Sequence, residues 1–548
     1  MEIIFNIVLV LARFMNFLTG PIYTLIYRGK KEVVPPVRDP LLKIPAIELA
    51  RRIRSKEISS EELCKAYIRR IKEVNPIINA IVEDRFEEAI KDAKAVDEYL
   101  KTTSLSELEI EKIKPLLGVP MTIKESCSVK GMSTSVGIVS RIGMKAERDG
   151  EAVAILRSSG AILLLVSTTP EFCLSWETYN FITGCTRNPY DSTRTSAGSS
   201  GGEVCKLKCF NEANHTLTVY RGALLGSGAS VVGLGSDIAG SIRLPAMFNG
   251  VFGHKPTPQV TSIKDHYPGC KDERYCLYLV TGPMARYSCD LKFIFKILVG
   301  NKMSSELKLD EPVNLRDLKV FYMVDFGSGL TQFPVESSIK NAIKEAATHL
   351  TTTCGATLDE YKFWHFKDAI TVCVSTVINM RDVPNSLKLV KANLAVELIK
   401  SICGLSKFSL NILFFNCLRL MYKYVISDYV VKNEMWQTAI TEKLGENGVL
   451  ILPSFVASAQ RHHQFYFKPA FGYLIIANAL GLPSTSVPCG LDHHDMPIGF
   501  QVMAAPGQDR LCLAVAEELE RYFGGWVPPN ELTIKVFGGD KSDQQEKY

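Results

Sequence analysis

Several features that would assign the chain to a common functional class are missing from its sequence. The 15 cysteines form no CxxC pair and no cysteine–histidine cluster at the spacing of a zinc site. We therefore expect reduced, buried thiols, and neither a disulfide framework nor a metal centre. The formal charge of +5 is small for 548 residues and forms no basic stripe, which leaves nucleic-acid binding without support.

The glycine-rich loop AGSSGG, which begins at Ala197, also lacks the residues that define familiar glycine motifs. A phosphate loop would continue to Gly-Lys-Ser/Thr, whereas this loop continues to Glu203. The dinucleotide fingerprint GxGxxG fails elsewhere, because Val231 and Ile238 stand where its third glycine belongs. An elbow of the α/β-hydrolase type needs Gly-x-Ser-x-Gly, and the loop has alanine at the first position around Ser199.

The composition and patterning that are present indicate a layered α/β protein. The chain is 46% hydrophobic and 22% charged, which is typical of a globular protein with a substantial core. Short apolar runs alternate with helical patterns, such as the one that begins with the capping box of Ser59 and Glu62. This alternation predicts a central sheet with helices around it. The predicted strands are LLGVPMTI, GAILLLVS, VVGLGSD, GVLILPS, LPSTSVP and IGFQVMA.

Residues 1–31 are the most apolar part of the chain. They are apolar from Ile3 to Tyr27, interrupted mainly by Arg13 and Pro21, and end in basic residues. A signal peptide has positive charge before its apolar run and a cleavage site after it, and neither is evident. We expect an uncleaved membrane anchor on an endomembrane, either a single-pass helix or a monotopic interfacial one. A leader packed on the domain is the alternative.

Three further segments have a distinctive composition. Residues 32–41 are proline-rich and are expected to form an extended linker. Residues 407–425 are apolar almost all round and predict either a buried helix or a patch that dips into a membrane surface. The last residues, 537–548, are expected to form a loose tail.

Two motifs besides AGSSGG suggest chemistry. In GLGSDIAGSIRLP, a serine on a glycine-flanked turn follows an apolar strand, where backbone N–H groups can surround it as an acyl-transfer nucleophile requires. In GVPMTIKE, Lys124 ends an apolar strand, and burial favours the neutral amine that can accept a proton. Each motif alone is more often an ordinary turn or a solvated lysine.

Taken together and in this order, GVPMTIKE, SAGSSGGE and GLGSDIAGSIRLPAMFNGVFGHKPT resemble the amidase signature family of serine hydrolases. The C-terminal LGLPSTSVPCGL and PIGFQVMA are similar to that family too, so that the resemblance covers about residues 42–528. It implies an α/β amidase signature fold over residues 42–536, with a central mixed β-sheet covered by helices on both faces. Residues of about 300–440 would form the variable substrate channel.

The resemblance also implies a Ser–Ser–Lys triad. Ser241 would be the nucleophile, Ser199 the bridging serine with a cis peptide bond before it, and Lys124 the general base. Ser200 would support them by a hydrogen bond. The backbone N–H groups of the oxyanion hole would come from Ile238, Ala239, Gly240 and Ser241, where Ala239 replaces the glycine usual in the family.

The implied activity is hydrolysis of linear amides through an acyl-enzyme, without a metal or organic cofactor. The apolar N-terminus and the PAMFNGVFGHKP segment make the chain most similar to fatty-acid amide hydrolases, so we expect a lipid amide substrate, a membrane surface as partner and no nucleic acid. The pairs His462–His463 and His493–His494 receive no catalytic role. An amidase of small amides and a homodimer remain open alternatives.

An insert of 18 residues, Val204–Arg221, interrupts this pattern. It separates Ser199 and Ser241 by 42 positions, whereas the family leads us to expect about 24. It has no amphipathic period and begins where the helix behind the catalytic loop should start. Three interpretations are open, namely a gene-model artefact such as a translated intron, a genuine loop on an active enzyme, and an insert that abolishes catalysis and leaves a scaffold or binding protein.

Overall fold

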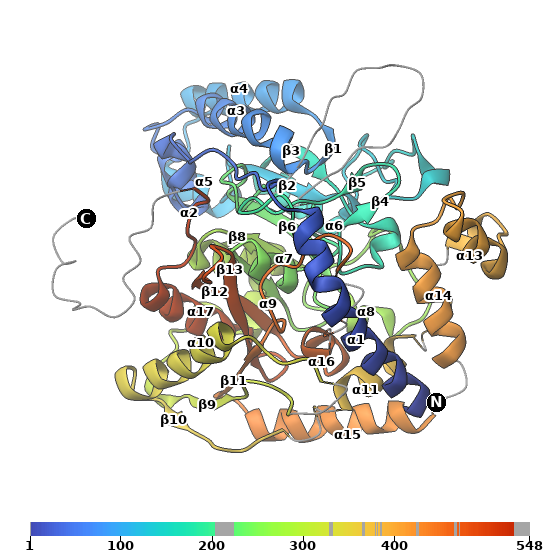
Figure 1. Cartoon of the computed structure of the whole chain (residues 1–548). Coiled ribbons are helices and arrows are strands. Elements are labelled where there is room, and N and C mark those ends of the chain that lie inside the picture. The colour runs from blue at the N-terminus through green and yellow to red at the C-terminus, as the bar shows by residue number, and fades with distance from the viewer. Residues whose placement is uncertain are drawn as a thin grey trace.

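One sheet of eleven strands runs through the centre of the protein (Figure 1). The structure is a computed structural model that describes residues 2–530 except 203–223, 328–331, 364, 365, 367, 379, 381, 384, 385, 423–426, 465–467, 469 and 471. In sheet order the strands are β1 (Ile81–Asp84), β3 (Ile162–Ser167), β2 (Pro120–Lys124), β6 (Val232–Asp237), β8 (Val280–Ala285), β7 (Phe252–Lys255), β12 (Ser484–Leu491), β13 (Pro497–Ala504), β11 (Gly448–Pro453), β9 (Lys319–Tyr322) and β10 (Thr357–Leu358). The short β4 (Tyr179–Asn180) and β5 (Gly184–Cys185) pair separately.

The sheet is mixed, and its parallel part positions the candidate site. β2 pairs in parallel with both β3 and β6, whereas β6 and β8 are antiparallel. Thr122 is in register with Gly233, and Ile123 with Leu234. Because the carboxyl ends of neighbouring parallel strands meet at one edge of a sheet, the last residues of β2 and β6 lie side by side.

Helices cover both faces of the sheet, which confirms the predicted α/β architecture. In Figure 1, α10 and α17 lie to the left of the sheet and α11 and α16 to its right. The helices are α1 (Glu2–Ile26), α2 (Ala46–Arg54), α3 (Ser60–Ile78), α4 (Phe86–Thr102), α5 (Glu107–Ile113), α6 (Glu151–Ser158), α7 (Arg243–Phe248), α8 (Tyr275–Tyr278), α9 (Ser288–Glu306), α10 (Ser337–Thr348), α11 (Ala369–Ile378), α12 (Ser386–Leu389), α13 (Leu394–Ile402), α14 (Leu410–Tyr422), α15 (Ser427–Leu444), α16 (Gly472–Ala479) and α17 (Asp509–Phe523).

The six predicted apolar strands are all strands of this sheet, and they are β2, β3, β6, β11, β12 and β13. Most are buried along their whole length, because helices cover both faces and leave no solvent side. That burial explains why these strands appear as continuous apolar runs in the sequence. At α3 the Ser59 side chain accepts a hydrogen bond of 3.0 Å from Glu62 N, which is one of the two hydrogen bonds of the predicted capping box.

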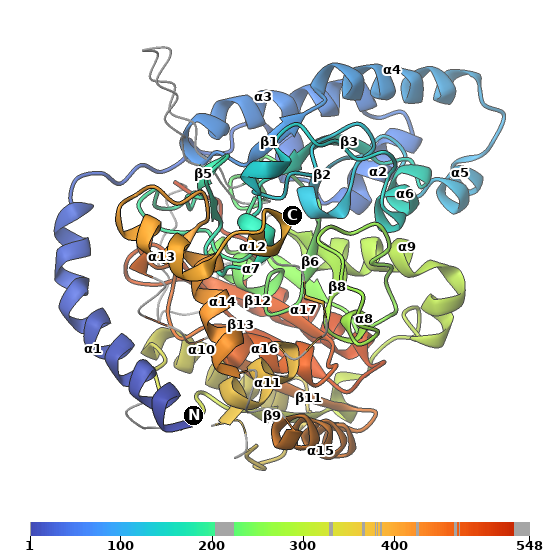
Figure 2. The same ribbon diagram turned by 90° about the vertical axis from the view of Figure 1, so that its right-hand side faces the viewer.

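The N-terminal segment is a single helix, α1, which lies along the outer edge of the molecule in Figure 2. In the part of the chain that the structure describes, no helix is long and apolar enough to cross a membrane. The expectation of a transmembrane helix at residues 1–31 is therefore not supported. α1 combines Arg13, Asn16 and Pro21 with its apolar residues, which lowers its mean hydropathy.

Two of the other segments of distinctive composition, residues 32–41 and 407–425, are partly buried. Val34 and Val37, within the predicted linker, are buried. α14 buries Ile412 and Leu413 and exposes other apolar side chains, so it is neither a fully buried helix nor a free one. The predicted insert 204–221 and tail 537–548 lie outside the described residues.

Candidate active site

Lys124 is the last residue of β2 and is completely buried. Its Nζ lies 2.7 Å from the Ser199 hydroxyl and 2.8 Å from the Ser236 hydroxyl. The Ser236 carbonyl oxygen is a third acceptor, at 3.3 Å. No described carboxylate forms an ion pair with Lys124. Among the described residues, the hydrogen-bond partners of this amine are hydroxyl and carbonyl groups, an arrangement suited to exchanging protons with a serine.

Ser236 links Lys124 to a histidine. It is the penultimate residue of β6, so the parallel pairing of β2 and β6 places it beside Lys124. Nε2 of His266 lies 2.9 Å from the Ser236 hydroxyl, and Nδ1 lies 3.3 Å from the carbonyl oxygen of Pro268. Burial, and to a smaller degree the neighbouring Lys124, lowers the pKa of His266 to about 3. The imidazole is therefore neutral at physiological pH.

The turn that carries Ser241 is organised around an ion pair, Asp237 with Arg243. Both side chains are completely buried, with 3.0 Å between Arg243 Nη2 and Asp237 Oδ1. The Asp237 carboxylate also accepts hydrogen bonds from Gly240 N at 2.7 Å and Ile242 N at 3.0 Å. Burial alone would raise the pKa of Asp237, but Arg243 and these hydrogen bonds lower it to about 2.

The predicted oxyanion-hole residues lie on this same turn, and their N–H groups differ in whether they already have a hydrogen-bond partner. The N–H of Gly240 is committed to Asp237, whereas the N–H groups of Ile238, Ala239 and Ser241 have no hydrogen-bond partner among the described residues. Gly240 has a φ of +98°, and a Cβ there would lie 2.6 Å from Leu474 Cβ, so only glycine fits. Three N–H groups beside a serine hydroxyl are donors suited to a developing oxyanion.

The Ser199 loop is held by neutral hydrogen bonds to its neighbours. Thr178 Oγ1 donates to the carbonyl oxygen of Gly198 at 2.5 Å. The Ser200 hydroxyl donates to Ser236 O at 3.1 Å, and Ser200 N donates to Ser241 O at 3.3 Å. Ser200 therefore connects the two serine motifs.

The structure brings Lys124 and Ser199 together, but the expected contact between Ser199 and Ser241 is not formed. Among the described residues, no hydrogen bond joins the hydroxyls of Ser199 and Ser241. The cis peptide bond expected before Ser199 is not found either, and the cis bond of the described chain precedes Pro268. Hydrogen bonds of catalytic groups often tighten only when substrate is bound.

A sequence model of the family described as Amidase matches residues 62–207 and 221–513. The chain belongs to the amidase family. The residues between the two matched parts, 208–220, fall inside the atypical insert. The predicted family and the predicted enzyme class are thus confirmed, and this amidase hydrolyses the C–N bond of amides.

Individual relatives agree with this assignment. The amidase is 37% identical to fatty-acid amide hydrolase 2-A of Danio rerio, with 92% of this chain and 93% of that protein covered. It is 36% identical to fatty-acid amide hydrolase 2 of Homo sapiens, with 96% and 99% covered. A solved fatty acid amide hydrolase superposes with a TM-score of 0.67 at 22% identity over 89% of this chain and 86% of that one. That structural similarity supports the fold.

Sequence reasoning missed two residues of this site, Ser236 and His266. Ser236 lies within the GLGSDIAGSIRLP motif but has no distinguishing signal there. His266 lies 21 positions after Pro245, the last residue of that motif, in a segment without a motif of its own. Only the hydrogen bond between the two side chains reveals their connection to Lys124.

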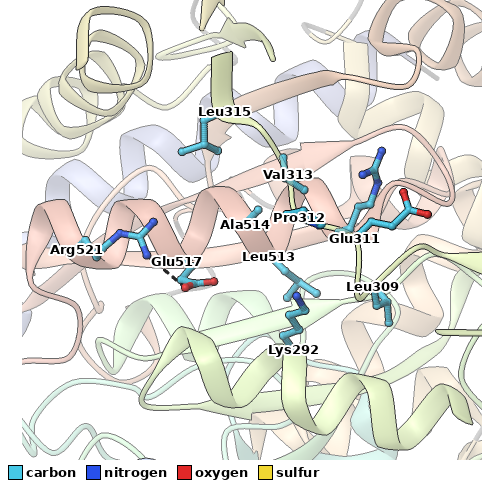
Figure 3. A pocket seen from close by; sticks show the side chains of 11 residues that line it. Lys292, Leu309, Glu311, Pro312, Val313, Leu315, Leu513, Ala514, Glu517 and Arg521 are labelled. Atoms are coloured by element: carbon cyan, nitrogen blue, oxygen red, sulfur yellow. Dashed lines mark hydrogen bonds and ion pairs between the residues drawn. The ribbon is translucent and has the colours of Figure 1, made fainter. Parts of the chain in front are cut away.

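The pocket in Figure 3 is separate from this site. It has a volume of about 230 Å³ and lies between α9 and α17. Its lining includes Lys292, Glu517 and Arg521, with Glu517 and Arg521 paired at 3.3 Å, and it includes neither serine of the site nor Lys124. Its charged lining differs from the apolar surroundings that a lipid chain requires.

Two groups of described side chains have the chemistry of metal ligands, and neither contains a residue of the candidate site. They are Glu177, Cys185 and His462, and His349, Cys354 and Glu518. In the first group, His462 Nδ1 lies 3.0 Å from Cys185 Sγ and 3.3 Å from Glu177 Oε1. Hydrogen bonds among the members account for both groups.

Proposed function

We propose that this amidase hydrolyses fatty-acid amides at a membrane surface, with Ser241 as nucleophile, Ser199 as bridging serine and Lys124 as general base. The observation that carries the proposal is the contact of 2.7 Å between Lys124 Nζ and the Ser199 hydroxyl. Lys124 is completely buried and forms no ion pair with a described carboxylate. Such a lysine, bonded to a serine beside a second serine motif, is suited to proton transfer rather than to a structural ion pair.

In the proposed reaction, neutral Lys124 accepts the proton of Ser199, and Ser199 accepts the proton of Ser241. Ser241 Oγ then forms a bond to the amide carbonyl carbon, and the carbonyl oxygen becomes an oxyanion that accepts hydrogen bonds from the free N–H groups of the turn. The proton returns along the same route to the amide nitrogen, whose bond to carbon breaks. Water hydrolyses the acyl-enzyme by the same steps. This route needs the Ser199 hydroxyl to move within hydrogen-bond distance of Ser241.

Two observations support a lipid amide and a membrane surface. The relatives described as fatty-acid amide hydrolases are covered over nearly their whole length. In addition, α1, α13 and α14 lie on one side of the molecule in Figure 2. These helices and the segment between α13 and α14 have exposed large apolar side chains. We call this set the apolar outer face, and its members include Phe14, Phe17, Leu18, Leu25, Ile399, Ile402, Leu405, Leu410 and Leu420. An exposed apolar surface of this kind favours monotopic binding to lipid.

Kinetics with two substrates test the chemistry and the substrate class. We expect the full chain to hydrolyse oleamide with a higher kcat/KM than a short-chain amide, because a lipid chain adds apolar binding energy. Ser241→Ala and Lys124→Ala should each lower kcat by at least about 10³-fold. The control is Ser262→Ala, at a partly exposed serine whose hydroxyl donates to Glu151. Unchanged hydrolysis by Ser241→Ala contradicts the nucleophile, and preference for the short amide contradicts the lipid substrate.

Flotation with phosphatidylcholine vesicles tests the membrane surface. We expect the full chain to float with the vesicles, and the double variant Phe17→Ser, Leu25→Ser to float less. The matched control is Leu108→Ser, Ile113→Ser, which removes two exposed apolar side chains from α5. Equal flotation of both double variants and the unchanged chain would show that the apolar outer face is not the binding surface.

A further inference from the structure

We propose that His266 is a positioning residue that makes Lys124 accept its proton from Ser199 and from no other group. His266 acts through the hydroxyl of Ser236, which it fixes as a hydrogen-bond donor. This inference rests on the proposed roles of Lys124 and Ser199. It extends the site beyond the three residues expected to exchange protons.

The orientation of His266 follows from the groups it contacts. Its Nδ1 faces the carbonyl oxygen of Pro268 at 3.3 Å. A carbonyl oxygen only accepts hydrogen bonds, so Nδ1 carries the proton of the neutral imidazole. Nε2 therefore presents a lone pair, and the Ser236 hydroxyl at 2.9 Å must donate to it. Tyr275 donates to the same Pro268 oxygen at 2.8 Å, which helps to hold that carbonyl in place.

This arrangement leaves the Ser236 hydroxyl without a proton for Lys124. Nζ of Lys124 has three acceptors, which are the Ser199 hydroxyl, the Ser236 hydroxyl and the Ser236 carbonyl oxygen. The ammonium form donates one hydrogen to each of them. The neutral form has only two hydrogens and one lone pair, and the lone pair must face a group that can donate.

Of the three acceptors, only Ser199 has a proton to offer. The Ser236 carbonyl oxygen has none, and the Ser236 hydroxyl already donates to His266. The two hydrogens of the neutral amine therefore go to Ser236 and its lone pair faces Ser199. Without an acceptor at residue 266, the Ser236 hydroxyl can turn and donate to Lys124, in competition with Ser199.

The surroundings keep His266 neutral. The groups near it are Lys124 from β2, Tyr275 from α8, and Asp265, whose carboxylate is paired with the exposed Arg148. The low pKa of the imidazole means that the same hydrogen-bond pattern holds throughout the pH range in which an amidase is assayed.

The test measures kcat and KM for oleamide hydrolysis by the full chain and its variants. His266→Leu removes the acceptor, and we expect kcat to fall by roughly 10- to 100-fold with KM unchanged, since small misplacement of a catalytic group has an effect of that order. His266→Gln places an amide oxygen near the position of Nε2 and should restore most of the rate. His254→Gln is the matched control. This buried histidine contacts Thr485 and Asp509 away from the site, so the variant should lower the Tm and leave kcat unchanged.

A double-mutant cycle with Ser236→Ala separates positioning from general stability. Because His266 acts through the Ser236 hydroxyl, His266→Leu should have no further effect on kcat in the Ser236→Ala background. Equal kcat for His266→Leu and the unchanged chain, or additive effects in the cycle, would overturn the inference. If His266→Leu does not fold, His266→Asn replaces it, and equal rates for the Asn and Gln variants overturn the inference. Loss of activity in Lys124→Ala shows in the same assays that the proposed function itself holds.

Discussion

The two turns that carry serines Ser241 and Ser199 are built in different ways. The Ser241 turn contains its own supports, because the carboxylate of Asp237 binds two N–H groups of the turn and the guanidinium of Arg243. Arg243 is bound in turn by Gln501 and Asn478 from β13 and α16. Within its described residues the Ser199 loop contains no such ion pair. It is held by hydrogen bonds to Thr178, Ser236 and Ser241, in addition to the contact of Ser199 with Lys124.

This difference bears on the insert. The charged network fixes the Ser241 turn whatever the length of the chain before it. The Ser199 loop is followed directly by residues 203–223, which contain the insert, so we expect its position to respond to the length of that segment. The catalytic geometry is therefore most sensitive to the insert at Ser199. Ser200 N already donates to Ser241 O, and a hydrogen bond between the hydroxyls of Ser199 and Ser241 would add a second link between the two turns.

Of the variants that test the difference between the two turns, Asp237→Ala should have the largest effect on stability and activity. The change leaves Arg243 buried without its partner, and breaking such a pair lowers the free energy of unfolding by about 3–5 kcal/mol. Urea denaturation measures the loss, and oleamide hydrolysis should be abolished in the same preparation. Asp310→Ala is the control, since its exposed pair with Lys296 should contribute at most about 1 kcal/mol. Equal midpoints for both variants would show that the network does not support the turn.

Low pH should also destabilise the Ser241 turn, as Asp237→Ala does. The pKa of Asp237 is lowered from 3.8 to about 2, so its contribution to stability is complete above pH of about 4 and is lost as the pH falls towards 2. We expect the urea midpoint of the full chain to fall over that range more than the midpoint of Asp237→Asn. Parallel pH curves for the two proteins would contradict this origin of the acid sensitivity.

Deletion of residues 204–221 tests whether the insert displaces the Ser199 loop. The deletion joins the Ser199 loop directly to the segment that leads into β6, so we expect kcat for oleamide to rise about 10-fold as the two serines come into contact. Peptide mass spectrometry of the natural protein adds a direct observation, because a peptide joining SAGSSGGE to GALLGSGAS would identify the insert as an artefact. A deletion variant that loses activity would show that the insert belongs to the working enzyme.

The smallest effect on stability and activity is expected from Thr178→Val, because Thr178 contributes one neutral hydrogen bond to the Ser199 loop. The change removes the hydrogen bond to Gly198 O and should lower the free energy of unfolding by about 1–2 kcal/mol, with a few-fold loss of kcat. Thr102→Val removes an exposed hydrogen bond in α4 and is the control. If Thr178→Val affects activity more than Asp237→Ala does, the ranking of the two turns is wrong.

Much of the fold and part of the site can be predicted from the sequence. The strands are recognisable because sheet burial makes them apolar over their whole length. Lys124 and Ser199 are 75 positions apart, and they are recognisable because their motifs occur in the order that resembles the amidase signature. Arg243 and His266 cannot be assigned roles in this way, because Arg243 binds Gln501 and Asn478 from distant elements and His266 binds Ser236 on β6. The apolar N-terminal pattern correctly predicts the helix α1, but it overstates the apolar length, since Arg13 and Pro21 interrupt it.

Labelling with a fluorophosphonate probe tests the catalytic proposal most directly. The probe bonds to activated serines, and mass spectrometry of the labelled peptides identifies the serine. We expect a single adduct on Ser241 that is absent from Ser241→Ala and strongly reduced in Lys124→Ala. An adduct on another serine, or equal labelling of Ser241→Ala, would contradict the assignment of the nucleophile.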